Sequence, residues 1–135
     1  MILGIEETFE IGKDTFFNSD SPITSYYVIF EDDLTTGYFY AVEKKSNLQI
    51  LDALHIYNAI DVIDKDKLCE IRIIWSNNGL VVFLLINGYC HALFDFENQA
   101  GYCRTAFPKS QSNWTKVKER NLTDELLSEL IQNNP

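Results

Sequence analysis

The feature that most constrains this chain is the stretch 70–97, in which Asn-Gly occurs twice between apolar runs, at 78–79 and 87–88. Asn-Gly favours a tight β-turn because both residues tolerate the positive φ angles that a type I′ turn requires. The run between the turns, 80–86, is apolar throughout. A strand with one face in water would alternate apolar and polar residues, so this run predicts a central strand covered on both faces. The stretch therefore predicts three antiparallel strands at the centre of the fold.

The turn at 87–88 also predicts the register of the second hairpin. A two-residue loop places Leu85 opposite Cys90, and the alternation of side chains then assigns every other pair to one of two faces. One face is expected to hold Leu85–Cys90, Phe83–Ala92 and Val81–Phe94, and the other Leu84–His91, Val82–Leu93 and Leu80–Asp95.

Runs rich in β-branched and aromatic residues predict further strands between clusters of turn-forming residues. These strands are 1–11 at a sheet edge, 23–31, 38–43 (followed by a turn at 44–47), 48–58, and 102–108, which ends at Pro108. The segment 48–58 fits a strand better than a helix because its apolar residues alternate with one interruption, Asp52. We expect 12–22 to be a loop with Phe16 and Phe17 turned inward, and 59–68 to be a charged connector with at most one helical turn.

The segment 121–134 predicts the one helix. Thr123 suits the N-cap position, and acidic residues in the first turn favour the helix dipole. The apolar stripe of this helix is Leu126, Leu127, Leu130 and Ile131, and Leu122 is expected to pack on Leu127 at its start. A helix this short must dock on other elements, and the doubly apolar central strand offers a place to do so.

These elements predict an α+β fold that is mainly antiparallel β. We expect a meander-like sheet of six or seven strands with the C-terminal helix packed on one face. The 135 residues are expected to form a single domain, with 115–135 as a tail and helix, and with Trp114 anchoring that tail on the core.

The charge of the chain bears on its partners. Its formal net charge is −9, which argues against a nucleic-acid-binding protein because such proteins carry a basic face. Residues 1–33 hold eight acids and one base, whereas 104–120 hold five bases and one acid. Two solvated surfaces of opposite sign would explain this asymmetry, and so would an acidic surface around Asp32 and Asp33 that captures a basic protein.

Cysteine usage and the first residues indicate the compartment. The three cysteines lack the spacing of a disulfide framework or a zinc site. The N-terminus lacks the basic start of a signal peptide, and no apolar run is long enough to span a membrane. We therefore expect a cytoplasmic protein with free thiols, of which Cys103 is the best candidate for a reactive one because Arg104 adjoins it.

Chemical motifs are missing from the sequence. It contains no Walker A, dinucleotide-binding, zincin or nucleophile-elbow pattern, so we predict neither a catalytic site nor a cofactor. The two histidines, His55 and His91, favour hydrogen-bonded side chains over metal ligands, and the cluster 31–33 favours a solvated turn over a calcium site. We expect Arg104 to pair with Asp95 or Glu97.

Several phrases of the sequence carry a family resemblance. In chain order they are EETFEIGKDTF (6–16), FEDDLTTGYFYA (30–41), DALHIYN (52–58), WSNNGL (75–80), LLINGYCHALFDFE (84–97) and GYCRTAFP (101–108). They resemble a family of small uncharacterised bacterial proteins, the domain-of-unknown-function family 2251, over residues 1 to about 114. The resemblance implies an intracellular bacterial protein and carries over no catalytic residues.

Three functions are compatible with these features. The leading one is non-enzymatic, a module that binds a basic protein through an acidic surface, for which an immunity-type antitoxin is one concrete form. The second is a small-ligand module whose aromatic residues line a pocket between sheet and helix (Tyr26, Tyr27, Tyr38, Phe39, Tyr40, Tyr57, Tyr102). The third is an enzyme built on His91, Asp95, Cys103 and Arg104. The five residues predicted to bind are Asp32, Asp33, His91, Asp95 and Arg104, and a homodimer through an exposed strand stays open.

Overall fold

A computed structural model of the chain describes residues 1–45, 49–64 and 66–135. The strands are β1 (Ile2–Phe9), β2 (Thr15–Asp20), β3 (Tyr26–Asp32), β4 (Thr36–Glu43), β5 (Gln49–Asn58), β6 (Cys69–Trp75), β7 (Val81–Ile86), β8 (Tyr89–Asp95) and β9 (Ala100–Cys103). A 3-10 turn, η1 (Ala59–Asp61), follows β5, and one helix, α1 (Asp124–Asn133), lies near the C-terminus. The prediction of a mainly antiparallel β fold with a C-terminal helix is confirmed.

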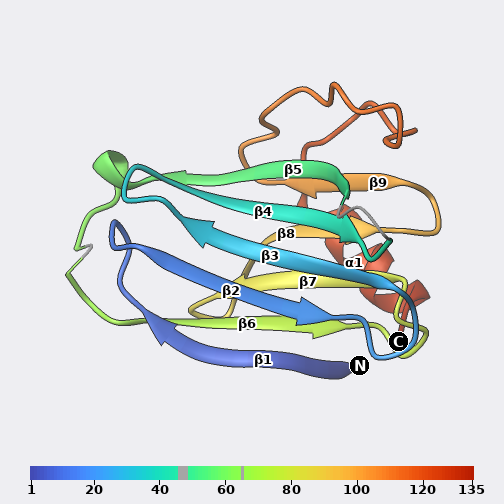
Figure 1. Ribbon diagram of the computed structural model, residues 1–135, viewed down its shortest axis with the longest axis horizontal. Coiled ribbons are helices and arrows are strands. Elements are labelled where there is room, and N and C mark those ends of the chain that lie inside the picture. The colour runs from blue at the N-terminus through green and yellow to red at the C-terminus, as the bar shows by residue number, and fades with distance from the viewer. Residues whose placement is uncertain (46–48, 65) are drawn as a thin grey trace.

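The strands form two sheets, not the single meander that the sequence predicts. Sheet A has the order β1-β6-β7-β8-β9 and sheet B the order β2-β3-β4-β5, and all pairs within them are antiparallel (Figure 1). The meander is wrong because β1 pairs with β6, far along the chain, and leaves β2 to start the second sheet. The two sheets pack face to face as a sandwich.

The central three strands are confirmed as β6, β7 and β8. Asn87 and Gly88 form the predicted two-residue turn with φ angles of 53° and 78°. The turn at 78–79 is different, because the loop runs from Ser76 to Leu80 and only Gly79 has a positive φ, of 71°. The Asn78 side chain accepts hydrogen bonds from Ser76 Oγ (2.7 Å) and from the Leu80 backbone N–H (3.0 Å), so it fixes a longer loop than a type I′ turn.

The predicted register of the second hairpin is right at the turn and wrong beyond it. Leu85 faces Cys90 as predicted, but the pairing shifts at a β-bulge after Leu84, so Phe83 faces Leu93. The other four pairs predicted beyond the turn are shifted in the same way, because one extra residue in β8 moves its later side chains to opposite faces. Ala92 and Phe94 therefore point into the sandwich, and Leu93 points outward.

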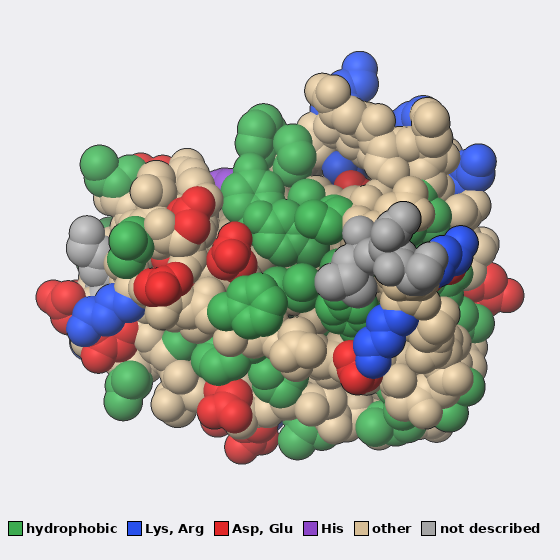
Figure 2. Space-filling model, viewed as in Figure 1, with side chains coloured by type: hydrophobic (Ala, Val, Ile, Leu, Met, Phe, Trp, Pro, Cys, Tyr) green, Lys and Arg blue, Asp and Glu red, His purple; other side chains and the backbone are tan. Residues whose placement is uncertain are grey.

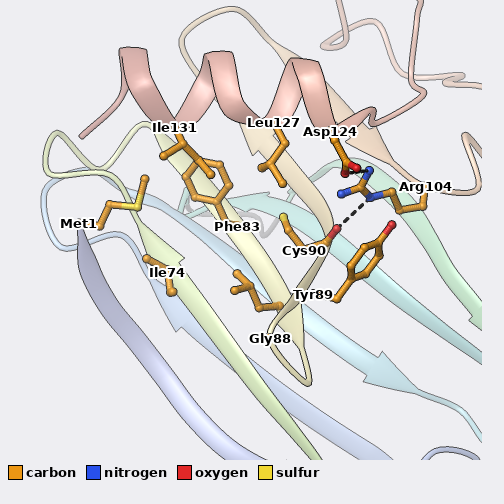
Figure 3. A pocket seen from close by; sticks show the side chains of 11 residues that line it. Met1, Ile74, Phe83, Gly88, Tyr89, Cys90, Arg104, Asp124, Leu127 and Ile131 are labelled. Carbon is orange, nitrogen blue, oxygen red and sulfur yellow. Dashed lines mark hydrogen bonds and ion pairs between the residues drawn. The ribbon is translucent and has the colours of Figure 1, made fainter.

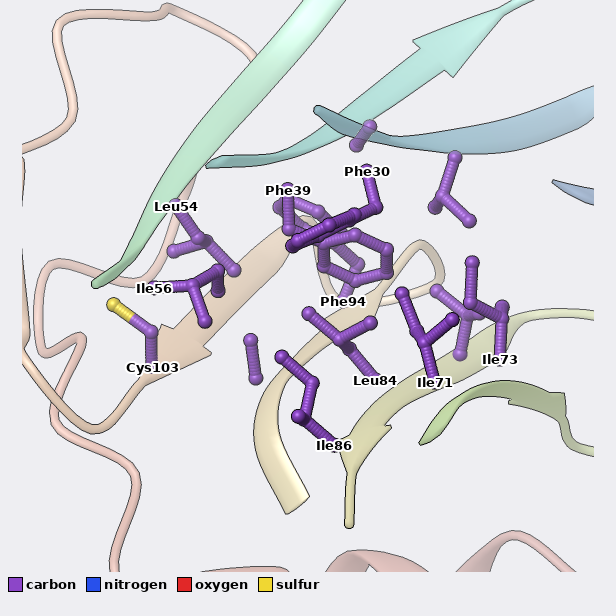
Figure 4. Close-up of a cluster of buried hydrophobic side chains, with 14 of the residues drawn as sticks. Phe30, Phe39, Leu54, Ile56, Ile71, Ile73, Leu84, Ile86, Phe94 and Cys103 are labelled. Carbon is purple, nitrogen blue, oxygen red and sulfur yellow. The ribbon is translucent and has the colours of Figure 1, made fainter. Parts of the chain in front are cut away.

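The core lies between the two sheets (Figure 4). Its largest fully buried side chains are Trp75, Phe30, Phe39 and Phe94, and the rings of Phe39 and Phe94 stack with their centroids 5.2 Å apart. The one polar atom of Trp75, the indole Nε1–H, donates to Ser19 Oγ at 2.9 Å. The sandwich interior is therefore filled by packed side chains, and the buried polar atom of Trp75 has a hydrogen-bond partner.

A second apolar cluster lies on the outer face of sheet A, beneath α1. Val81, Phe83 and Leu93 are buried there against Leu126, Leu127 and Leu130 of the helix. The central strand β7 is thus covered on both faces, as its unbroken apolar run predicts. Thr123 caps the helix as predicted, because its hydroxyl accepts the Leu126 backbone N–H at 3.1 Å.

The segment between β9 and α1 is a strap, defined here as residues 104–121, and not a continuation of the strand. β9 ends at Cys103, so the predicted strand 102–108 is confirmed at its first two residues and wrong from 104 onward. The strap is fixed by Arg120, whose Nη2 donates to Asp52 Oδ2 of β5 at 2.5 Å while both side chains are only 3% exposed. Trp114 packs edge-on against Phe96 of the core, which confirms the predicted anchor.

Two further expectations concern sheet B. The segment 48–58 is a strand over its described residues (Leu48, like Ser46 and Asn47 of the predicted turn 44–47, lies outside them), so this prediction is confirmed for β5. The loop predicted for 12–22 is wrong, because 15–20 forms β2 and pairs with β3. Phe16 points away from the core and is 59% exposed, whereas Phe17 packs against it.

Candidate functional site

The outer face of sheet B is the one large surface of a sheet that no described element of the chain covers. Figure 2 looks onto it, with hydrophobic side chains in the middle and Asp and Glu side chains beside them. We call it the open face and define it by eight outward side chains on β2, β3 and β4, which are Phe16, Asn18, Asp20, Tyr27, Ile29, Glu31, Tyr38 and Tyr40.

Strand register arranges these side chains in rows across the sheet. Glu31 lies between Phe16 on β2 and Tyr38 on β4. Ile29 lies between Asn18 and Tyr40 in the next row. The rings of Tyr38 and Tyr40 stack with centroids 5.9 Å apart and an angle of 18° between their planes. The face thus presents two parallel tyrosine rings with a carboxylate in the adjacent strand.

The electrostatics of the open face are negative. The pKa of the Tyr40 hydroxyl is raised, first by burial of part of the side chain and then by the charge of Glu31. A neighbouring anion opposes a second negative charge, so Glu31 adds to the effect of burial on this hydroxyl. Nearby in the turn after β3, Asp33 adds another exposed carboxylate.

The open face already binds one cation from its own chain. Lys44 Nζ lies 5.6 Å from the centroid of the Tyr27 ring and 2.7 Å from Asp20 Oδ2. A lysine held by a tyrosine ring and a carboxylate combines cation–π attraction with an ion pair. The outer face of β2–β4 thus holds one cation of the chain itself, between a ring and a carboxylate.

A hollow of about 530 Å³ adjoins the open face beyond β4. Its lining includes Tyr38, His55 of β5 and Phe107 of the strap. The His55 ring is held on both sides, because Nδ1 is 3.1 Å from Thr105 Oγ1 and Nε2 is 2.9 Å from Asn58 Oδ1. His55 is therefore a hydrogen-bonded, mostly buried side chain, as the sequence favours.

The structure separates the two predicted acids of the 32–33 turn. Asp32 is fully buried, and its carboxylate accepts hydrogen bonds from the backbone of Gly12 (2.7 Å) and Leu34 (2.8 Å) and from the Tyr57 hydroxyl (2.5 Å). It cannot contribute to an acidic surface, because all of its hydrogen bonds are made inside the fold. The expectation of a solvated turn is wrong for this residue.

Asp33 is exposed, as expected for a solvated turn. Its Oδ1 accepts the backbone N–H of Thr35 at 3.0 Å and of Thr36 at 2.8 Å. These backbone bonds, that from Thr36 first, lower the pKa of the Asp33 carboxyl and keep it charged. Within the described residues no three His, Cys, Asp or Glu side chains are grouped as metal ligands would be.

The other predicted residues do not form one site. Cys103 is fully buried in the core, and Asp95 is buried at the end of β8, where it accepts the backbone and side-chain N–H groups of Asn98 in the following turn. Arg104 lies under the start of α1, and the Arg104 backbone N–H donates to the His91 carbonyl at 3.1 Å. Burial, and then the charge of the Arg104 guanidinium, lower the His91 pKa to about 4.

Two of these placements correct the sequence analysis. Arg104 pairs with Asp124 of α1 at 2.9 Å, and not with Asp95 or Glu97, because the strap turns its side chain towards the helix. Cys103 is not an accessible thiol, because β9 points its side chain between the sheets.

The aromatic residues predicted to line one pocket are also divided. Tyr26, Phe39 and Tyr57 face the sandwich interior, and Tyr102 lies in the cluster under α1. Only Tyr27, Tyr38 and Tyr40 share a surface, the open face.

The sequence predicts Tyr38 and Tyr40 among the pocket aromatics and Glu31 in an acidic turn, but it does not bring the three together on one face. Glu31, Tyr38 and Tyr40 lie on predicted strands, but their proximity depends on the pairing of β3 with β4. The visible signal is the spacing of Tyr38 and Tyr40 two residues apart, which puts both rings on one face of a strand.

Comparison with known proteins places the chain in a family. A family model described as an uncharacterized protein conserved in bacteria (DUF2251) matches residues 9–131. The chain belongs to this family. The match includes the strap and most of α1, so the similarity extends beyond residue 114, where the sequence resemblance ends.

A curated relative supports the same assignment. An uncharacterized protein of Haemophilus influenzae is 37% identical over 123 residues, which cover 88% of this chain and 76% of the relative. No solved structure matches the chain. In the part of the chain that the structure describes, no helix has the length and apolar character to cross a membrane.

Proposed function

We propose that this protein is a non-enzymatic interaction module whose open face binds a basic segment of another protein. The observation that carries the proposal is the uncovered pair of stacked tyrosines, Tyr38 and Tyr40, beside Glu31 on the neighbouring strand. Flat tyrosine rings supply contact area at low entropic cost, and their hydroxyls tolerate water before the partner binds.

The chemistry of the partner follows from the charge and the rings. A lysine or arginine side chain would lie over Tyr38 or Tyr40 and pair with Glu31, as Lys44 lies over Tyr27 and pairs with Asp20. Among the described residues Glu31 forms no ion pair, so its carboxylate is available to such a group. The hollow beside Tyr38 gives room for a neighbouring side chain of the partner.

The net charge of the whole chain favours the same class of partner. A charge of −9 accelerates encounter with a basic protein and weakens encounter with an acidic one. An inhibitor of a basic toxin, as in immunity proteins, is one concrete form of this function. We place the acidic surface at Glu31 and Asp33 beside Tyr38 and Tyr40, and not at Asp32, which is fully buried.

The test is a capture experiment from bacterial lysate at low and at moderate salt, run in parallel with wild-type protein and charge-reversal variants. We expect a basic protein to be retained by the wild type, released as salt rises, and lost from Glu31→Lys. The matched control is Glu7→Lys, which makes the same charge change on the exposed surface of β1, in the other sheet. Equal losses from both variants would contradict a specific open-face site.

A second comparison isolates the aromatic contribution. With the captured partner purified, association and dissociation rates are measured for Tyr40→Leu and Tyr40→Phe. We expect Tyr40→Leu to speed dissociation roughly tenfold and Tyr40→Phe to change it little, because only the leucine removes the ring. A partner that binds both variants like the wild type uses another surface.

A further inference from the structure

A groove lies on the opposite side of the molecule, where α1 crosses the outer face of sheet A (Figure 3). Its volume is about 310 Å³. Its walls are mostly apolar and come from the N-terminal residue, β6, β7, β8 and α1, with Ile74, Phe83, Leu85, Tyr89, Leu127 and Ile131 as the main lining. At about 30 Å³ for each non-hydrogen atom, the volume that a water molecule occupies in the liquid, the groove has room for roughly ten such atoms.

One end of the groove is polar because Arg104 lies there. Arg104 is held in place by its own chain, since Nε donates to the Cys90 carbonyl at 3.0 Å and Nη1 to the Leu122 carbonyl at 3.1 Å. The Tyr89 ring stacks on the guanidinium, 4.6 Å from its central carbon. These contacts fix a cation at one end of the apolar groove. The remaining nitrogen of Arg104, Nη2, makes no hydrogen bond to the described residues.

The anion that now neutralises Arg104 is easily replaced. Asp124 Oδ1 lies 2.9 Å from Arg104 Nη1, but the Asp124 side chain is 83% exposed, whereas that of Arg104 is 19% exposed. The Asp124 carboxylate is already hydrated, so it loses little if it leaves Arg104. The mostly buried Arg104 guanidinium, in contrast, needs an anionic partner. A carboxylate that arrives along the groove would satisfy Arg104 in its place, and two oxygens would match the planar guanidinium.

We propose that this groove binds an unbranched aliphatic monocarboxylate of about ten non-hydrogen atoms, with its chain along the apolar walls and its carboxylate on Arg104 in place of Asp124. This site is independent of the open face, since it lies on the other sheet and uses none of its residues. Charge decides the class of ligand, because the group held by hydrogen bonds at the groove is a cation and its ion-pair partner is an exposed anion.

The first experiment is a titration calorimetry series with hexanoate, octanoate and decanoate below their micellar concentrations. We expect the dissociation constant to fall about fourfold for each added CH₂ group until the groove is filled. Decylamine and decanol, which match decanoate in length, should bind at least tenfold more weakly because neither brings an anion to Arg104. Equal binding of decanoate and decylamine, or the absence of a chain-length dependence, would overturn the proposal.

Two matched pairs of variants then test the site itself. Asp124→Asn removes the competing carboxylate, so we expect decanoate to bind about threefold to tenfold more tightly. Glu125→Gln makes the same charge change one residue later in the first turn of α1 and should leave the affinity within twofold. A weaker or unchanged affinity in Asp124→Asn would show that Asp124 does not compete with the ligand, and would overturn the proposal.

The second pair fills the groove without touching Arg104. Ile131 lines the groove and is 43% exposed, so Ile131→Trp should fold and lower decanoate affinity at least tenfold. Ile60→Trp adds the same side chain at an 88% exposed position outside the groove and serves as control. Sedimentation velocity covers the alternative occupant, a second copy of the chain. A wild-type dimer that Ile131→Trp converts to monomer would overturn the ligand proposal.

Discussion

The two outer faces of the sandwich teach different lessons about how the chain treats apolar surface. On sheet A the outward side chains of β7 and β8 include Val81, Phe83 and Leu93, and the chain covers them with the leucines of α1. On sheet B the outward side chains include Tyr38 and Tyr40, and no described element covers them. Aliphatic side chains gain most from removal from water, whereas tyrosines can keep their hydroxyls hydrated. The covered face is therefore part of the apolar core, whereas the open face leaves its tyrosines in contact with solvent.

The helix α1, which covers sheet A, is nevertheless anchored on sheet B through the strap. The strap carries the chain from β9 to α1, and its end is held by the ion pair between Arg120 and Asp52 of β5. Thr115 Oγ1 donates to the same carboxylate at 2.8 Å, and Arg120 Nη1 donates to the Pro108 carbonyl at 2.7 Å. The two faces are thus coupled through one buried carboxylate.

The largest expected effect comes from breaking that coupling. Arg120→Met leaves the buried Asp52 without its cation, so we expect the free energy of unfolding to fall by about 3–5 kcal/mol. Urea unfolding measures the loss. The double variant Asp52→Leu with Arg120→Met removes both charges and should recover most of the stability, because no unpaired charge remains buried. A double variant as unstable as Arg120→Met alone would mean that packing, not charge, holds the strap.

The next prediction compares the two faces directly. Leu93 is fully buried under α1, so Leu93→Ala should cost roughly 2–5 kcal/mol of unfolding free energy. Ile29 is only half-buried on the open face, so Ile29→Ala should cost less than about 1 kcal/mol. Both variants remove a similar number of carbon atoms, and thermal or urea unfolding measures both. Similar losses would show that the open face is packed as tightly as the covered one.

The sequence alone identified much of the covered face and little of the open one. The unbroken apolar run of β7 predicted its double coverage, and Thr123 predicted the start of α1, because these signals are local. The pairing of β1 with β6 and the bulge in β8 were not predictable, since they depend on contacts between distant segments and on an extra residue that leaves no mark in the pattern.

Buried polar residues were the second source of error. Asp52 read as an interruption of an apolar strand, and Asp32 read as part of a solvated turn, yet each accepts several hydrogen bonds inside the fold. A sequence shows the charge of such a residue but not its partners. The candidate site could not be assembled from the sequence for the same reason, because Glu31 and Tyr40 become neighbours only when β3 and β4 pair.

A smaller effect is expected from pH at the margin of the covered face. Burial and the Arg104 charge lower the His91 pKa from 6.5 to about 4 in the folded protein. Between these values the unfolded chain binds more protons, so stability is full above pH 6.5 and falls as the pH drops towards 4. Allowing for partial exposure, we expect His91 to account for roughly 1–2 kcal/mol of this loss.

The variant His91→Gln tests this assignment. Between pH 7 and pH 5, the free energy of unfolding of this variant should fall by roughly 1–2 kcal/mol less than that of the wild type. Identical pH dependence in the two proteins would assign the acid sensitivity to other groups.

The smallest expected effect tests whether α1 unfolds separately from the two sheets. Thr123→Ala removes the cap on the Leu126 N–H and should cost about 1 kcal/mol. Ser128→Ala, an exposed position inside the helix, is the control and should be neutral or slightly stabilising. Hydrogen exchange distinguishes a local effect from a global one. If α1 opens as a separate unit, the cap variant should speed exchange of the α1 amides and leave the amides of β3 and β4 unchanged. Faster exchange in β3 and β4 as well would mean that α1 and sheet B unfold together. The strap, which is held to β5 by the ion pair with Asp52, would explain that result.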